Sequence, residues 1–291
     1  MSRQPVFFVH LLMICCAGLV AGSFTVGEAI ATGLDPAILT LVRFVLATFL
    51  FAPFIYWRYG LDVKISALLR YSLVSGVLVA FFWTMFLALR TTTALNTSVI
   101  FTLVPAISAL YARILVGERL HGRLPALLLA AVGALWVIFR GDVGQFLTLD
   151  WNQGDLIFFG GCLVMALYTP LVRLLHRGEP MAVMTFWIMV TGCVWLLFVT
   201  GNELSGVNWG RVSFKVWSGI FYLAVFSTII SFFLSQYAIL SLGPTRVMAY
   251  SYLYPLLVLV INRLLGHPWP DPVIYPGVVL LLAAMFVFQR R

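Results

Sequence analysis

The chain has 291 residues, of which 62% are apolar and only 10% charged, and its mean hydropathy is +1.04. A soluble domain is nearer half apolar and a quarter charged, and its surface-to-volume ratio does not allow so many apolar side chains to be hidden from water. The composition therefore excludes a water-soluble fold and predicts an integral membrane protein, in which the net charge of +8 sets topology and does not indicate nucleic-acid binding.

The first apolar run has two interpretations. Arg3, the run that follows it and the Ala-Gly-Ser sequence at 21–23 would also suit a cleaved signal peptide. The apolar stretch continues to about residue 27, however, and no soluble segment follows it. We therefore interpret it as a retained transmembrane helix.

A helix needs about 20 residues to cross a hydrocarbon core about 30 Å thick. Apolar runs separated by charges or by Gly and Pro predict ten such helices. They are 6–27, 36–57, 67–89, 94–115, 124–139, 156–175, 181–200, 212–240, 246–265 and 272–288. The connections between them are short, so the chain has no room for a separate soluble domain.

The positive-inside rule tests this count, because Lys and Arg gather in cytoplasmic loops. With the N-terminus in the cytoplasm, twelve basic residues fall on the cytoplasmic side and five on the other. The cytoplasmic set is Arg3, Arg58, Lys64, Arg70, Arg113, Arg119, Arg123, Arg173, Arg177, Arg246, Arg290 and Arg291. The external set is Arg90, Arg140, Arg211, Lys215 and Arg263, whereas Arg43 lies inside a predicted helix. The charges therefore predict that both termini are cytoplasmic.

The two halves of the chain, 1–143 and 144–291, match weakly at an offset of 150 residues. The matching positions are Ala88, Leu103, Pro105, Arg113 and Leu115 with Ala238, Leu253, Pro255, Arg263 and Leu265. Both prolines fall near the middle of a predicted span, where a proline is either a tolerated kink or a hinge. Since each half has five spans, the halves would be inverted repeats, a plan that secondary transporters use with the substrate site between the halves.

Short motifs run through the whole chain. They are 94–105 (ALNTSVIFTLVP), 115–120 (LVGERL), 41–44 (LVRF), 154–156 (GDL) and 166–168 (ALY). Together they resemble the drug/metabolite transporter superfamily, specifically its ten-helix, EamA-like exporters, in which a proline-containing fourth helix ends in a Gly-Glu pair. The second half departs from this pattern, because 265–268 reads LGHP where the family usually repeats Gly-Glu.

The resemblance implies an all-α carrier with ten transmembrane helices in two inverted repeats, working by alternating access. Within the family the chain most resembles bacterial aromatic amino acid exporters, which also handle methyl viologen. The implied function is export of aromatic or neutral amino acids and related small metabolites across the cytoplasmic membrane. The direction rests on the resemblance alone, and the exact substrate, the coupling ion and the oligomeric state stay open, with a monomer possible.

Polar groups inside spans are costly and so are candidate functional residues. Arg43 lies about eight residues into the second predicted helix, or roughly 12 Å deep at 1.5 Å per residue. Glu28 is its nearest counter-charge by topology, and such a pair would serve packing. The functional alternative is that the Arg43 guanidinium binds a substrate carboxylate through its paired donors.

The remaining candidates are amides and aromatic side chains inside the spans. An amide can bind an amino acid or a neighbouring helix, and an aromatic wall suits a flat or cationic solute, although each ring could equally serve in core packing or face lipid. The candidates are Tyr250, Tyr254, Phe82, Phe86, Trp83, Asn96, Gln236, Tyr168 and Trp187. We expect the cavity to be lined largely by the third, fourth, eighth and ninth helices.

Several features argue against cofactors and chemical catalysis. The sequence has no Gly-rich phosphate-binding loop for ATP, its four cysteines lack metal-ligand spacing, and no carboxylate is predicted deep within a span. We therefore expect no cofactor or metal and facilitated, gradient-driven efflux. Three alternatives remain: a proton-coupled multidrug or cation efflux carrier of the same superfamily, a channel, and a membrane-embedded enzyme, for which no Ser/His pair or acidic cluster is well placed.

Overall fold

The computed structural model describes residues 6–117, 124–142, 144, 151–201, 203–242 and 244–290. Within these residues all regular secondary structure is helical. In the described part of the chain, nine helical stretches are long and apolar enough to cross a bilayer, and Pro125–Ile138 is a shorter apolar helix. In order, these ten correspond to the ten predicted spans, so the predicted all-α membrane fold is confirmed.

The helices follow one another with short connections, and several spans are interrupted. The first five spans are α1 (Val6–Ile30), α2 (Pro36–Tyr59), α3 (Ile65–Ala88), α4 (Ala94–Phe101) with α5 (Val104–Val116), and α6 (Leu124–Ile138). The sixth span consists of α8 (Gln153–Met165) and α9 (Tyr168–Leu175), and the seventh is α10 (Met181–Thr200). The eighth consists of α12 (Phe214–Ala224), the π-helix η2 (Val225–Ile230) and α13 (Ser231–Leu242). The ninth consists of α14 (Pro244–Met248), the 3₁₀ helix η3 (Ala249–Leu253) and α15 (Tyr254–Leu264), and the tenth is α16 (Tyr275–Arg290). Three short helices lie in connections: α11 (Glu203–Gly206), η1 (Trp209–Arg211) and η4 (Pro272–Ile274).

Side-chain caps set where several spans begin. Asp35, Thr93 and Asn152 precede α2, α4 and α8, and each side chain accepts a hydrogen bond from a backbone N–H of the first turn. These bonds satisfy donors that a helix start leaves without an internal partner. Gly60 ends α2 at a φ of +77°, a conformation that costs glycine little.

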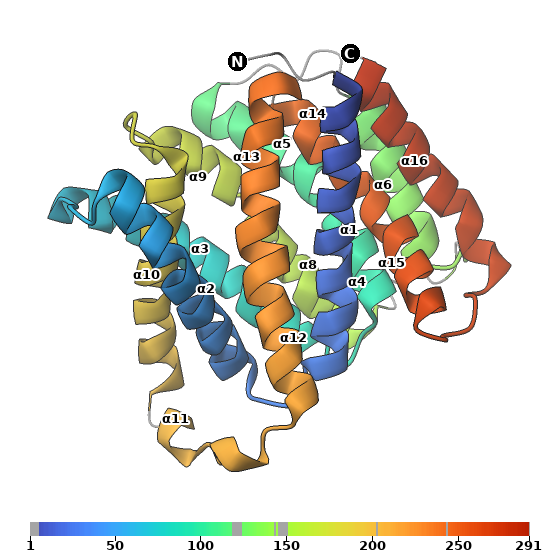
Figure 1. The fold of residues 1–291 in the computed structure, drawn as a ribbon. Coiled ribbons are helices and arrows are strands. Elements are labelled where there is room, and N and C mark those ends of the chain that lie inside the picture. Colours follow the sequence, from blue (N-terminus) through green and yellow to red (C-terminus); the bar gives the residue numbers. More distant parts are fainter. Residues whose placement is uncertain are drawn as a thin grey trace.

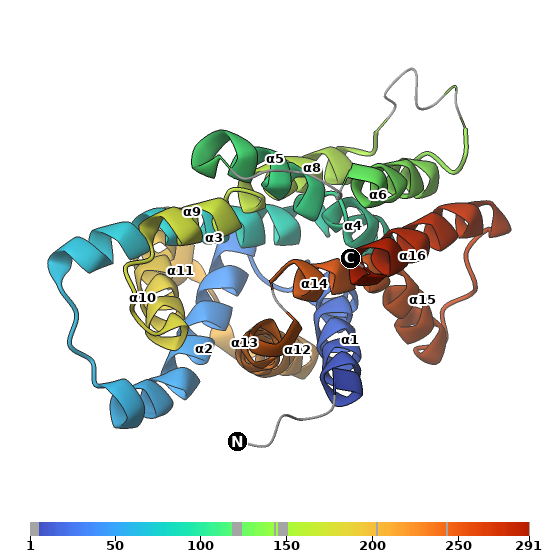
Figure 2. The same cartoon turned by 90° about the horizontal axis from the view of Figure 1, so that it is seen from above.

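The two halves of the chain interlock and form a single bundle. Helix α1 packs against α12, α13 and α15, α2 and α3 pack against α10, and α6 packs against α16. Figure 1 places the start of α1 and the end of α16 at the same end of the bundle, as ten spans require, and Figure 2 shows the bundle from that end. That the halves are inverted repeats stays a prediction.

The outer surface of the bundle is apolar. Trp57, Phe198 and Phe7 are 83%, 79% and 78% exposed. Such exposure would be costly in water but is favourable against lipid tails, which are as apolar as these side chains. The protein is therefore an integral membrane protein in its surface as well as in its composition.

Some sequence-based predictions fall outside the described residues. They concern the topology residues Arg3, Arg119, Arg123 and Arg291, the glutamate of the Gly-Glu pair, Glu118, and the last residue of the proposed first half, 143.

Candidate substrate-binding site

Three spans are interrupted at a proline. Helix α4 ends at Phe101 and α5 begins with Pro105 in its first turn, and α15 begins in the same way with Pro255. Because proline has no N–H and its ring clashes with the preceding turn, a continuous α-helix is unfavourable there. The sequence located these two prolines. It missed the third, Pro170, which follows the gap between α8 and α9.

A fourth irregularity lies in the eighth span. Residues 225–230 form the π-helical turn η2, where Thr228 Oγ1 donates to the Leu223 carbonyl oxygen at 2.8 Å. This bond comes from a side chain and is separate from the backbone hydrogen bonds that define the turn. π-turns within α-helices are frequent at functional sites. No sequence pattern predicted it.

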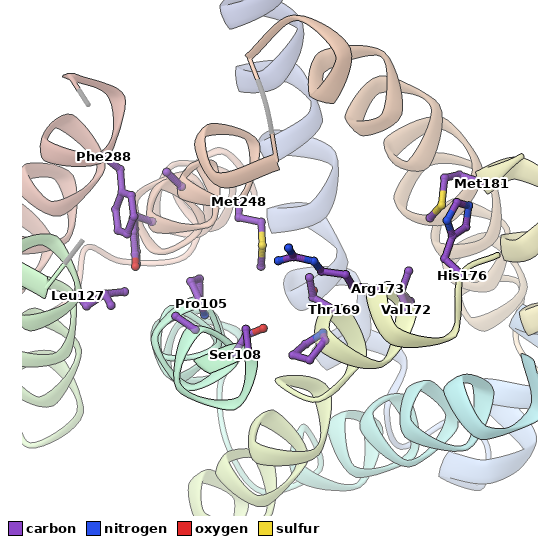
Figure 3. Close-up of a pocket in the computed structure, with 15 residues that line it drawn as sticks. Pro105, Ser108, Leu127, Thr169, Val172, Arg173, His176, Met181, Met248 and Phe288 are labelled. Atoms are coloured by element: carbon purple, nitrogen blue, oxygen red, sulfur yellow. The ribbon is translucent and has the colours of Figure 1, made fainter. Parts of the chain in front are cut away.

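A cavity of about 530 Å³ opens beside all three proline interruptions. Its wall includes Pro105 and Ser108 of α5, Thr169 and Arg173 of α9, and Tyr252 of η3. Figure 3 shows the α5 residues facing the α9 residues, with the Arg173 side chain reaching across towards Met248. The fourth, sixth and ninth predicted spans thus line this cavity, together with residues of α6 and α16, whereas the third and eighth do not.

The cavity has the composition of a small-molecule site, namely apolar walls with a few polar groups. Leu127 and Phe288 contribute apolar wall, and Ser108 and Arg173 contribute polar groups. The Tyr252 side chain is only 1% exposed, and its hydroxyl has no hydrogen-bond partner in the described part of the chain. An unpaired buried hydroxyl is costly, so this group is available to a polar solute.

Three aromatic rings from different spans meet at the level of the interruptions. The Tyr254 ring centroid lies 5.8 Å from that of Phe101 and 6.1 Å from that of Phe24, and the last two are 5.9 Å apart. Phe101 is the last residue of α4 and Tyr254 is the first of α15, so both rings stand at a break. Tyr254 was predicted; Phe24 and Phe101 were missed because apolar rings are common in every span.

The aromatic contacts continue from this triad to the second helix. Phe101 contacts Phe81, whose centroid lies 5.1 Å from that of Phe82. Phe82 in turn packs against Phe44 at 5.7 Å, and its ring lies under the guanidinium of Arg43, 4.1 Å from ring centroid to Cζ. A continuous aromatic path therefore joins the interruptions to Arg43.

Arg43 is the most unusual side chain of the interior. It is 2% exposed, and its Nε and Nη2 donate to Thr228 Oγ1 at 3.3 and 3.0 Å. Its Nη1 is buried without a hydrogen-bond partner. Within the described chain, Arg43 forms no ion pair, and Glu28 instead accepts a 2.8 Å hydrogen bond from the Ala94 amide at the start of α4. The predicted Arg43–Glu28 pair is therefore wrong, because the helix N-terminus competes for the carboxylate.

Two of the other predicted polar candidates, Tyr250 and Asn96, have hydrogen-bond partners within the protein. Tyr250 is 2% exposed and its hydroxyl hydrogen-bonds His10 Nδ1 of α1. The Asn96 amide donates to Asp155 Oδ2 at 2.9 Å, joining α4 to α8. Gln236 lies half-buried on α13. Substrate binding by these residues stays a prediction, alongside these structural contacts.

The aromatic candidates divide by burial. Phe86 is fully buried in the core and Trp83 is 39% exposed on the outer face. Tyr168 begins α9, directly before the cavity residue Thr169, and is half-buried. The indole Nε1 of Trp187, in α10, is buried without a hydrogen-bond partner in the described chain. Both Tyr168 and Trp187 pack against the cluster around Tyr71 and Met184, and substrate binding by the aromatic candidates stays a prediction.

Asp155 corrects a sequence-based expectation. It directly precedes the predicted sixth span, 156–175, but in the structure it lies in the first turn of α8 and is 3% exposed. Thr92 Oγ1 and Asn96 Nδ2 donate to its two carboxylate oxygens, so the buried charge is held by hydrogen bonds. A buried carboxylate thus does lie inside a span, near its end. Among the described residues, no three His, Cys, Asp or Glu side chains gather as a metal site would require.

A ten-helix membrane bundle, broken at mid-span around an internal cavity, has the architecture of a secondary transporter. The chain belongs to the EamA-like transporter family, whose model matches residues 7–140 and again 152–289. This membership confirms the resemblance to the drug/metabolite transporter superfamily.

The relatives carry transporter names without a substrate. The chain is 28% identical over 185 residues to the uncharacterized transporter YyaM of Bacillus subtilis (strain 168), a match that spans 63% of this chain and 60% of the relative. It is 25% identical over 287 residues to an uncharacterized transporter of Archaeoglobus fulgidus, covering 97% of both chains. A solved structure titled "Crystal structure of protein" shares the fold, with a TM-score of 0.66 and 17% identity over 98% of this chain and 96% of that one.

Proposed function

We propose that this transporter exports amino acids with aromatic or neutral side chains, and related small metabolites, across the bacterial cytoplasmic membrane by alternating access. One observation carries the proposal: the cavity lies where three spans are broken, and the rings of Phe101 and Tyr254 stand at two of these breaks. The halves 1–143 and 144–291 would be the moving units, with Pro105 and Pro255 as hinges.

The chemistry of the breaks suits an amino acid. Interrupted helices free backbone N–H and C=O groups, which are tolerated inside a membrane only where they are buried in protein or line a cavity. Such groups can hydrogen-bond an ammonium or a carboxylate. The aromatic rings supply stacking surface for a flat side chain. Tyr250, Tyr254, Phe82, Phe86, Trp83, Asn96, Gln236, Tyr168, Trp187 and Arg43 remain the proposed binding set.

The two ends of the bundle differ in a way that supports alternating access. At the end opposite the termini, Arg90 donates to the carbonyl oxygens of Ala31 and Leu34, and Thr25 Oγ1 donates to Asn262 Oδ1 at 3.0 Å. Together with the Glu28–Ala94 bond, these contacts tie that end together. The cavity lies towards the other end, where the exposed Arg173 forms part of its wall. By the positive-inside rule that end is cytoplasmic, so the cavity would load solute from inside the cell.

We favour facilitated diffusion over coupled antiport. A proton relay usually needs several titratable groups at depth. Asp155 is buried but lies in the first turn of its span and is already held by Thr92 and Asn96. A proton-coupled multidrug or cation carrier is the alternative within the superfamily. A membrane enzyme is the alternative of another class, and we propose that the protein is not one.

The test is uptake and counterflow of radiolabelled amino acids by the purified protein in liposomes, with and without a pH gradient. We expect saturable uptake of phenylalanine and tryptophan, faster than that of glutamate and unaffected by the gradient. Uptake that requires the gradient would contradict facilitated diffusion. An absence of flux for every amino acid, in protein shown to be folded, would contradict the proposed substrate class.

A further inference from the structure

The interior holds a positive charge that no described residue neutralises. Arg43 is 2% exposed, and the groups around its guanidinium are the Thr228 hydroxyl and the Phe82 ring. Both are uncharged, and Nη1 has no acceptor in the described chain. A buried ion without a counter-charge carries a large desolvation cost that a hydroxyl and a cation–π contact offset only in part.

The hydrogen bonds of this guanidinium fix its orientation and leave one of its nitrogens free to bind an acceptor. Thr228 Oγ1 donates its own proton to the Leu223 carbonyl at 2.8 Å, so its oxygen is free to accept from both Nε and Nη2 of Arg43. The π-helical geometry of η2 places this hydroxyl. Two nitrogens are thereby fixed by one oxygen, which holds the guanidinium plane and leaves Nη1 as the remaining donor.

Phe82 connects this charge to the proposed solute path. Its ring covers one face of the guanidinium and is half-buried, and it is the last ring of the series that runs from Tyr254 through Phe101 and Phe81. A rotation of the Phe82 side chain would uncover the guanidinium on the side of the aromatic path. A solute that stacks on these rings would then bring its polar group to Nη1.

We propose that Arg43, fixed by Thr228 and covered by Phe82, is a carboxylate-binding site that makes this carrier select solutes bearing a negative group beside an apolar or aromatic body. The inference rests on the proposed function and names its substrate class. Guanidinium and carboxylate match in charge and in hydrogen-bond geometry. The same charge repels a cation strongly in a low-dielectric interior, so the site disfavours organic cations.

The experiment compares three ligands that share one ring: phenylalanine, 3-phenylpropionate, which keeps the carboxylate alone, and phenethylamine, which keeps the ammonium alone. Binding to the purified full chain is measured as a shift in thermal unfolding, followed by tryptophan fluorescence, and transport is measured as flux in liposomes. We expect phenylalanine and phenylpropionate to stabilise the protein and phenethylamine to leave it unchanged. Stabilisation by phenethylamine equal to that by phenylpropionate would overturn the carboxylate site while leaving transport itself intact.

The variants are Arg43→Met, Arg43→Lys and, as a matched control, Arg58→Met in the exposed last turn of the same helix. Arg43→Met should weaken phenylpropionate binding about ten- to hundredfold, the value of hydrogen bonds to a charged group. Arg43→Lys should retain part of it, and Arg58→Met should retain all of it.

Folding provides the second readout. Since no residue in the described part of the chain neutralises the charge of Arg43, Arg43→Met should leave the unfolding temperature of the ligand-free protein unchanged or higher. A purely structural arginine predicts the opposite pattern, a lower unfolding temperature with phenylpropionate affinity retained, and that result would overturn the inference. Stabilisation of the wild type by chloride alone, with none by phenylpropionate, would overturn it as well. Failure of every ligand to bind or move would instead count against the proposed function.

Discussion

The rings of Phe101 and Tyr254 lie 5.8 Å apart, although one residue ends α4 and the other begins α15. Phe101 precedes α5, whose first turn contains Pro105, and Tyr254 begins α15, whose first turn contains Pro255. The contact thus joins two broken helices of opposite halves of the chain. It brings two of the breaks together, and residues close to both breaks, Pro105 and Tyr252, line the cavity.

We expect Tyr254→Ala to lower the flux of phenylalanine roughly two- to tenfold, the value of one aromatic contact beyond area burial. Tyr254→Phe keeps the ring and should stay close to the wild type. The measurement is initial uptake in liposomes. Trp57→Ala is the control, because Trp57 of α2 is 83% exposed and lies outside the proposed binding set, so flux should stay unchanged. An equal loss in this control would show that any aromatic truncation impairs the protein.

Replacing either hinge proline should separate binding from movement. Pro105→Ala and Pro255→Ala allow the broken helices to become continuous, which favours one conformation. Proline destabilises a continuous helix by ~3 kcal/mol. If half of this free energy changes the equilibrium between the two transport conformations, that equilibrium shifts about tenfold, and we expect maximal flux to fall by the same factor.

Ligand-induced thermal stabilisation should survive in both variants. Pro53→Ala is the matched control, because Pro53 lies inside α2, which continues past it without a break. Equal effects of all three substitutions, or unchanged flux in the first two, would contradict a hinge role for the matched pair.

Glu179 ties the α9–α10 connection to α3. Its carboxylate pairs with Arg70 at 3.2 Å, accepts from the Tyr71 hydroxyl at 3.0 Å and accepts from the Arg177 amide at 2.8 Å. Burial raises the pKa of Glu179, but the backbone hydrogen bonds, the Tyr71 hydroxyl and the Arg70 charge together outweigh burial and hold the pKa below its ordinary value of 4.5.

Because the folded-state pKa is lowered, the stabilisation from Glu179 is fully present above the ordinary pKa and is lost as the pH falls through the folded value. Glu179→Gln should therefore destabilise the protein at pH 7 by about 1 kcal/mol, given the partial exposure of the ion pair. The difference between variant and wild type, measured by thermal unfolding, should shrink as the pH is lowered below 4.5. A difference that stays constant from neutral to acid pH would show that the ionised carboxylate is not what stabilises this connection.

A glycine pair allows α6 and α16 to approach closely. A Cβ on Gly133 would lie 2.7 Å from the Gly277 carbonyl oxygen, and a Cβ on Gly277 would lie 2.6 Å from that of Gly133. Both contacts are with backbone, so neither can be relieved by a rotamer change. We expect Gly277→Ala to destabilise the protein by about 1–3 kcal/mol, the usual range for overpacking.

Unfolding in mixed micelles provides the measurement. Gly160→Ala is the matched control, since a Cβ on Gly160 of α8 meets nothing within 4 Å. Alanine is the better helix former, so this control should be neutral or slightly stabilising. Equal destabilisation by both substitutions would point to a general sensitivity of the helices to alanine and away from the close crossing.

The sequence predicted the spans well and their contacts poorly. Runs of apolar residues predicted all ten helices, and Pro105 and Pro255 predicted two of the breaks. Both predictions succeeded because each depends only on residues that are neighbours in the sequence. The break at Pro170 was not predicted, because the first half has no proline at the position 150 residues earlier. The Arg43–Glu28 pair was wrong because proximity along the topology ignores competition from the free amides of α4.

Composition and the lengths of the apolar runs by themselves determined the class of the protein and the number of helices, since both depend on the transfer of local segments from water to lipid. The partners were decided by tertiary structure alone. Three contacts depend on how helices distant in the chain cross. They are the contact of the Tyr254 ring with Phe101, the hydrogen bond between His10 and Tyr250, and the hydrogen bonds of Arg43 to Thr228 in the π-turn. In a chain that is apolar on nearly every helix face, hydrophobicity does not distinguish one crossing from another; packing shape and the few polar groups do.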